Sequence, residues 1–212
     1  MKKYIIASAA LVFAVAIQSC NTESKKETTT TMDGMTNKDS VKMGQNNMEG
    51  THSMNGMKMT GDFDYDFANT MLMHHQSAVD MAKNEISKGS NAEVKTMAQN
   101  IVTAQEGEIA QLKNIIANYK MPEMKKENGE SHNELGETME KMEVKMKGMV
   151  KTGNADKDFL MMMIPHHESA VTMGEDELSH GKNLELKKMA QKIIEDQSKE
   201  IKQFEAMLAK MK

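Results

Sequence analysis

The segment MLMHHQSAVDMA at residues 71–82 returns as MMIPHHESAVTMG at residues 162–174. Both segments belong to a longer internal duplication, because residues 62–113 align with residues 154–205 at a constant offset of 92 and without a gap. Of these 52 aligned positions, 24 are identical. The chain is therefore predicted to contain two copies of one structural unit.

Each copy consists of two apolar-periodic stretches separated by a glycine and an asparagine. These residues are Gly89 and Asn91 in the first copy and Gly181 and Asn183 in the second. Gly is favoured just after the end of a helix, and Asn just before the start of one. Each copy is thus predicted to be a helical hairpin, and two hairpins make an all-α four-helix bundle.

The second stretch of each copy has apolar residues at three- and four-residue spacing, which predicts one buried helix face. The residues on these faces are Met97, Ile101, Ala104, Ile109 and Leu112 in the first copy and Met189, Ile193, Ile201 and Phe204 in the second. Between the copies, an apolar seam steps alternately by four and three residues, and consists of Leu135, Met139, Met142, Met146 and Met149. This seam predicts an extra helix in the connection, whose flexible methionines pack on the bundle.

The N-terminus MKKYIIASAALVFAVAIQSC has the pattern of a secretory signal, with Lys2 and Lys3 before an apolar run that is too short to span a membrane. Cys20 is the only cysteine, and the stretch IQSC resembles a bacterial lipobox. Cys20 is then the lipidated first residue of a protein anchored in the cell envelope, in the periplasm or at the outer membrane. The alternative is an ordinary cleaved signal with a chance cysteine.

A polar tract without apolar periodicity follows the signal and is predicted to be a disordered tether. Methionine makes up 25 of the 212 residues of the chain, and the tether holds an unusual share of them. Its candidate metal-capturing residues are Met32, Met35, Met43, Met48, His52, Met54, Met57 and Met59. Thioethers are soft donors suited to Cu(I) or Ag(I). Compositional drift in a linker is the alternative explanation.

The predicted organisation thus has three parts. They are the signal peptide at residues 1–19, the lipidated cysteine and tether at residues 20–61, and the bundle at residues 62–211. Within the bundle, repeat one is expected at residues 62–118, the connector helix at residues 130–151 and repeat two at residues 154–211.

The two His pairs are expected to lie on helix faces that also carry methionine. Counting from Met71, the imidazoles of the first copy fall at i+3 and i+4, with Ala78 and Met81 further along the same face. Neutral imidazole and thioether together suit monovalent copper. The candidate metal ligands in the bundle are Met71, Met73, His74, His75, Met81, Met97, Met163, His166, His167, Met173 and Met189.

Adjacent residues on a helix point about 100° apart, so the two imidazoles of one pair cannot easily hold the same ion. One His of each pair is expected to face the metal, and its neighbour another helix or solvent. The alternative is a structural role, in which the imidazoles bond to buried polar groups. The candidate partners are Gln105, Glu108, Gln197 and Glu200. Pro165 stands where the first copy has Met73 and is expected to start or kink the helix there.

The motifs of the two copies resemble the family called domain of unknown function 305. In the first copy they are Asp66-Phe67, MHHQSAVDMA and MAQNIVTAQEGEI; in the second they are Asp158-Phe159, IPHHESAVTMG and MAQKIIEDQSKEI. The resemblance covers most of residues 62–208 and leaves residues 1–61 outside. It implies a ferritin-like four-helix fold, placement outside the cytoplasm and, for some members, copper or silver binding with a role in resistance. The family's MxPHH motif falls on Met163, Pro165, His166 and His167, and on Met71, His74 and His75, where Met73 departs from it.

Other classes of function fit the sequence less well. With 27 basic and 31 acidic residues and no basic stripe, the chain is not expected to bind nucleic acid. A di-iron site needs two Glu-x-x-His motifs, whereas Glu177 and His180 form one and the first copy has Glu85 and Lys88 instead. A glycine-rich phosphate loop, a nucleophile elbow and the His spacing of zinc hydrolases are missing, so the protein is not expected to be an enzyme.

The sequence thus predicts an extracytoplasmic protein that binds and sequesters Cu(I) or Ag(I) without an organic cofactor. Its expected partners are the metal ion, the membrane through Cys20, and copper efflux or chaperone proteins. Binding by the His residues is expected to weaken below about pH 6.5, where imidazole becomes charged, whereas thioether capture survives mild acid. The alternative is an envelope protein–protein interaction module in which the His pairs are structural.

Overall fold

The computed structural model describes residues 59–122 and 133–211. The predicted signal peptide, Cys20 and the tether up to residue 58 lie outside the described residues. Of the tether methionines, only Met59 is described, and it packs partly buried against the core. The backbone N–H groups of the next two residues, Thr60 and Gly61, donate to the carboxylate of Asp66.

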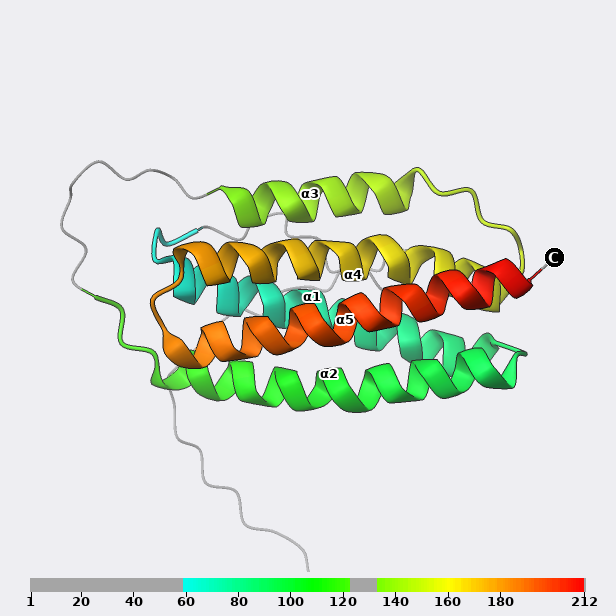
Figure 1. The fold of residues 1–212 in the computed structure, drawn as a ribbon, viewed down its shortest axis with the longest axis horizontal. Coiled ribbons are helices and arrows are strands. Elements are labelled where there is room, and N and C mark those ends of the chain that lie inside the picture. Colours follow the sequence, from blue (N-terminus) through cyan, green and yellow to red (C-terminus); the bar gives the residue numbers. More distant parts are fainter. Residues whose placement is uncertain (1–58, 123–132, 212) are drawn as a thin grey trace, which may run out of the picture. The chain divides into compact units, whose positions relative to one another are not determined.

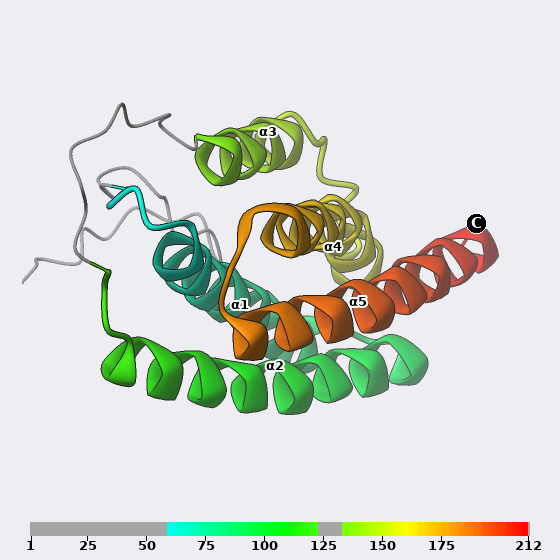
Figure 2. The ribbon, with the colours of Figure 1, turned by 60° about the vertical axis from the view of Figure 1, so that its left-hand side comes forward.

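The described residues form five helices. They are α1 (Phe63–Lys88), α2 (Ala92–Asn118), α3 (Glu134–Lys147), α4 (Ala155–His180) and α5 (Leu184–Lys210). Helices α1 and α2 form one antiparallel hairpin and α4 and α5 the other, and α3 lies along α4 on the outside of the four (Figures 1 and 2). The predicted all-α bundle of two hairpins with an extra helix in the connection is confirmed. In the described part of the chain, no helix combines the length and the apolar character that crossing a membrane requires.

The helix starts follow the predicted capping chemistry. The side chain of Asn91 accepts from the backbone N–H groups of Glu93 and Val94, and Asn183 does the same for α5. These bonds satisfy donors that the first turn of a helix leaves free. Helix α4 does not begin at Pro165, because this residue lies well inside the helix.

The core differs from the predicted faces at two positions. Ala104 of α2 is exposed and Ile201 of α5 is only partly buried, whereas the neighbouring Gln105 and the equivalent Gln197 are both 3% exposed. The inward face of α2 is therefore partly polar, because its side chains meet the buried imidazoles of α1. Four of the five seam residues, Leu135, Met139, Met142 and Met146, are buried as predicted, whereas Met149 lies beyond the end of α3 and is only partly buried.

Candidate metal centre

The four imidazoles of the His pairs are fully buried at the contact between α1 and α4. His74 and His166 face each other across this contact, with ring centroids 3.7 Å apart. His75 and His167 point away from it, each toward the second helix of its own hairpin. The two imidazoles of each pair therefore face different helices, and only the first of them contacts the other hairpin.

His75 and His167 are each bound to a carboxylate. Nε2 of His75 lies 2.9 Å from Oε2 of Glu108, and Nε2 of His167 lies 2.9 Å from Oε2 of Glu200. A carboxylate only accepts hydrogen bonds, so Nε2 carries the proton in both rings. In the neutral ring, Nδ1 is then an unprotonated acceptor, and in both residues it is buried and makes no hydrogen bond. These contacts match the structural role considered for the His pairs, and they also match metal-binding histidines, whose second nitrogen usually donates to a carboxylate.

His74 and His166 have different hydrogen bonds. Nε2 of His74 lies 2.8 Å from Oγ of Ser169 and 3.0 Å from the carbonyl oxygen of His166. The imidazole of His166 approaches the carbonyl of His74, but neither of its nitrogens reaches hydrogen-bonding geometry. A buried polar atom without a partner costs about 1–3 kcal/mol. His166 is the only one of the four imidazoles with neither ring nitrogen hydrogen-bonded.

Burial holds the pKa values of His74 and His166 well below the usual range, and the neighbouring imidazoles lower them further. Both rings are therefore neutral near pH 7. A proton competes with a metal ion for these two rings only at a pH below the usual imidazole value of about 6.5.

The predicted methionines of the bundle are buried to different degrees. Met71, Met163 and Met173 are fully buried, and Met81, Met97 and Met189 are nearly so. Met71 and Met163 each stand one helical turn before the first imidazole of their pair, on the same helix face. Met73, which replaces the family's proline, is only partly buried.

Glu108 and Glu200, which bind the second imidazole of each pair, have different surroundings in the two hairpins. Oε1 of Glu108 also accepts from Nζ of Lys192, at 2.9 Å, and its side chain is 9% exposed. Burial raises the pKa of Glu108, but the contacts with His75 and Lys192 outweigh burial and hold the pKa below its usual value. The residue equivalent to Lys192 in the first copy is Asn100, which cannot form an ion pair, and the side chain of Glu200 is 20% exposed.

Two pairs of carboxyl groups at the ends of the bundle were not predicted from the sequence. Asp64 of α1 accepts from the backbone N–H groups of Lys182 and Asn183 in the opposite hairpin, and its carboxyl group meets that of Glu177. Asp156 of α4 is the equivalent residue in the second copy. It accepts from Ser90 and Asn91, and meets Glu85. The identity of all four acids between the copies was the only sequence signal.

Burial, followed by the facing aspartate, raises the pKa of Glu85 to about 8 and that of Glu177 to about 9. Although burial raises the pKa of Asp156 as well, the N–H groups of Asn91 and Ser90 hold it below the usual value. At neutral pH, the glutamate of each pair is thus protonated and can donate to its aspartate.

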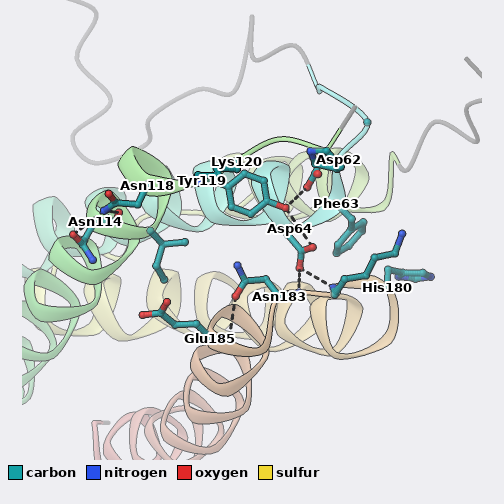
Figure 3. Close-up of a pocket in the computed structure, with 14 residues that line it drawn as sticks. Asp62, Phe63, Asp64, Asn114, Asn118, Tyr119, Lys120, His180, Asn183 and Glu185 are labelled. Carbon is teal, nitrogen blue, oxygen red and sulfur yellow. Dashed lines mark hydrogen bonds between the residues drawn. The ribbon is translucent and has the colours of Figure 1, made fainter. Parts of the chain in front are cut away.

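A pocket of about 740 Å³ opens at one end of the bundle, beside the Asp64 pair (Figure 3). The hydroxyl of Tyr119 donates to Asp62 there, at 2.7 Å, and the ring of His180 lies against Phe63. None of the predicted metal ligands lines this pocket.

In the part of the chain that the structure describes, no group of three or more His, Cys, Asp or Glu side chains is placed to hold a metal ion. His180 lies against Phe63, whereas Glu177 is fully buried and faces Asp64. The donors that the structure does gather at the centre of the bundle are imidazole nitrogens, with buried thioethers in the surrounding core.

Comparison with known proteins adds relatives in which metal has been seen. The family model described as "Domain of unknown function (DUF305)" matches residues 16–116 and 115–208, so the match starts closer to the N-terminus than the resemblance drawn from the motifs. None of the curated proteins matches the chain. A solved DUF305 fragment from Deinococcus radiodurans shares the fold at 23% identity, with a TM-score of 0.53 over 70% of this chain and 96% of that one.

The protein CopM is more similar in sequence. Its Cu(II)-bound form is 31% identical to this chain, with a TM-score of 0.54 over 70% of this chain and 97% of CopM. Its silver-bound form, obtained by co-crystallization, is 30% identical, with a TM-score of 0.53 over 69% and 96% of the two chains. CopM has also been solved in a Cu(I)-bound form.

Proposed function

We propose that this chain, which belongs to the family of domain of unknown function 305, binds and sequesters Cu(I) or Ag(I). Its structural neighbour CopM has been solved with silver bound and with Cu(I) bound. The observation that carries the proposal is the set of buried imidazole nitrogens without a hydrogen-bond partner. They are Nδ1 of His74, His75 and His167 and both nitrogens of His166. A soft cation bound to these atoms replaces the hydrogen bonds that burial denies them.

The surroundings favour a monovalent soft ion over a hard divalent one. Burial keeps His74 and His166 neutral, so the ion displaces no proton from them near pH 7. Thioethers such as Met71 and Met163 lie buried in the same core, and they suit Cu(I) and Ag(I) better than Mg²⁺ or Ca²⁺. Glu108 and Glu200 accept the Nε2 protons of their imidazoles and hold the rings in position. Such a site stores the ion away from groups that it would damage.

We place this activity outside the cytoplasm, on a chain anchored through Cys20. The support is the signal-like N-terminus and the IQSC stretch. The methionines of the tether then raise the concentration of thioethers near the bundle. Mass spectrometry of the mature protein checks the anchor, with loss of residues 1–19 and an acylated Cys20 as the expected result. An unmodified cysteine, or cleavage elsewhere, contradicts it.

The binding test is an anaerobic titration of residues 21–212 with Cu(I) against a chromophoric chelator. The bundle variant combines His74→Leu and His166→Leu, which fill the interior, with His75→Gln and His167→Gln, which keep a donor for each carboxylate. The tether variant changes each tether methionine outside the described residues to leucine and leaves the bundle unchanged. Circular dichroism and the melting temperature establish that both variants are folded.

We expect the wild type and the tether variant to retain tight Cu(I) binding, and the bundle variant to lose at least one tightly held ion. If the bundle variant still binds Cu(I) and the tether variant does not, the metal is held by the tether. If the wild type takes up no Cu(I), the contacts of His75 and His167 with Glu108 and Glu200 are structural. The interaction module then becomes the better description.

A further inference from the structure

Helix α3 breaks the approximate symmetry of the two hairpins at the metal centre. It packs mainly on α4, on the side away from α2 and α5 (Figure 2). Three methionines of α3 face the bundle at nearly equal burial, with Met139 5%, Met142 7% and Met146 6% exposed. Equal burial alone is what a packing seam requires, so burial does not distinguish the three.

Among the contacts between described residues, one of these methionines has a polar contact that the other two do not. Oγ of Ser169 lies 3.1 Å from Sδ of Met142 and 2.8 Å from Nε2 of His74, and it donates to the carbonyl of His166. A single hydroxyl thus touches both a thioether of α3 and an imidazole of α1. The sulfur and the nitrogen cannot be further apart than these two distances combined.

From this contact we infer that Met142 supplies a thioether ligand to a soft metal ion bound at Nε2 of His74. Metal bonds to nitrogen and sulfur are about 2.0 and 2.3 Å long. An ion bound to both donors holds them at most about 4.3 Å apart. The Ser169 hydroxyl therefore turns out of the gap, and the flexible side chain of Met142 closes on Nε2 of His74. For Nε2 to bind the ion, its proton moves to Nδ1 of the same ring, which has no other partner. The ring stays neutral and no proton is released.

The inference rests on the proposed function but concerns a ligand that the motif of the His pairs does not contain. It makes the site asymmetric, because α3 lies against α4 and not at the equivalent position of the first hairpin. It also gives the connector helix a role in binding beyond packing.

The test uses the ε-methyl NMR signals of methionine, which report each thioether separately. The chain with ¹³C-labelled methionine methyls is titrated with one equivalent of Ag(I), and the variants Met142→Leu, Met139→Leu and Met146→Leu assign the three signals. Met139→Leu and Met146→Leu are the matched controls, since all three changes swap side chains of similar volume in the same seam. Each variant is expected to keep the wild-type fold.

We expect the Met142 signal to shift on addition of Ag(I) while the signals of Met139 and Met146 stay in place. Met142→Leu should weaken Cu(I) binding at least about tenfold, the equivalent of about 1.4 kcal/mol, and the two controls should not. If the wild type binds the ion but the Met142 signal does not move, Met142 only packs and the proposed function stands without it. If the wild type binds neither ion, both proposals fall.

Discussion

Alanine at Gly181 is expected to lower the free energy of unfolding by about 2–3 kcal/mol, because the new Cβ has no room. It would lie 2.6 Å from the main-chain carbonyl oxygen of Glu177 and closer still to its carboxyl group. The same holds for Gly89, where a Cβ meets the carbonyl oxygen of Glu85 at 2.7 Å. Backbone strain plays no part, since the φ angles of Gly89 and Gly181 are −65° and −64°, which any residue adopts.

Gly107 provides the matched control. It lies inside α2, and a Cβ added there meets nothing within 4 Å. Gly107→Ala is expected to raise the stability by about 0.5–1 kcal/mol, because alanine favours the helix over glycine. Urea unfolding of the three single variants at pH 7 measures these effects. Equal changes at Gly107 and Gly181 would show that the glutamates do not occupy the space required.

The stability of the bundle is expected to fall as the pH rises from about 7 to about 8, by up to about 1.4 kcal/mol per pH unit for each protonated glutamate. Glu85 and Glu177 keep their protons up to pKa values of about 8 and about 9, whereas an unperturbed glutamate ionises at 4.5. The native state thus binds more protons than the unfolded chain throughout this interval. The stabilisation is complete below pH 4.5 and is lost as the pH passes through the two raised values.

The buried imidazoles act in the opposite direction at lower pH. Because the pKa values of His74 and His166 are lowered, the unfolded chain binds more protons than the native state below about pH 6.5, and acid destabilises the fold. Above pH 7, His74 and His166 are neutral in the fold and mostly neutral in the unfolded chain, so the raised pKa values of the two glutamates dominate the contribution of these four groups.

The control for the pH effect is the double variant Glu85→Gln and Glu177→Gln. An amide can donate to Asp156 or Asp64 as the protonated carboxyl does, but it does not titrate. Urea unfolding between pH 7 and 8 should therefore show a smaller slope in the double variant than in the wild type. A wild-type stability independent of pH in this range would mean that the glutamates are ionised in the fold.

Much of the fold followed from local features of the sequence. The duplication and the Gly and Asn positions predicted the two hairpins, since capping depends on residues within one turn of a helix end. The four-three steps of the α3 seam predicted its buried face. The face of α2 was predicted less well: an apolar count selected Ala104, which is exposed, whereas the polar residues Gln105 and Glu108 are buried. Glu108 is buried there because it binds the buried imidazole of His75.

The sequence by itself determined the helices, their pairing into hairpins and the presence of two His pairs beside methionines, because these depend on spacing along the chain. Only the tertiary structure decided which imidazole of each pair meets the other copy, and that Ser169 joins His74 to Met142. It also decided that Asp64 and Asp156 each bind the loop of the opposite hairpin. The physical reason is that these contacts join residues far apart in the chain, so that their geometry depends on how the two hairpins and α3 pack.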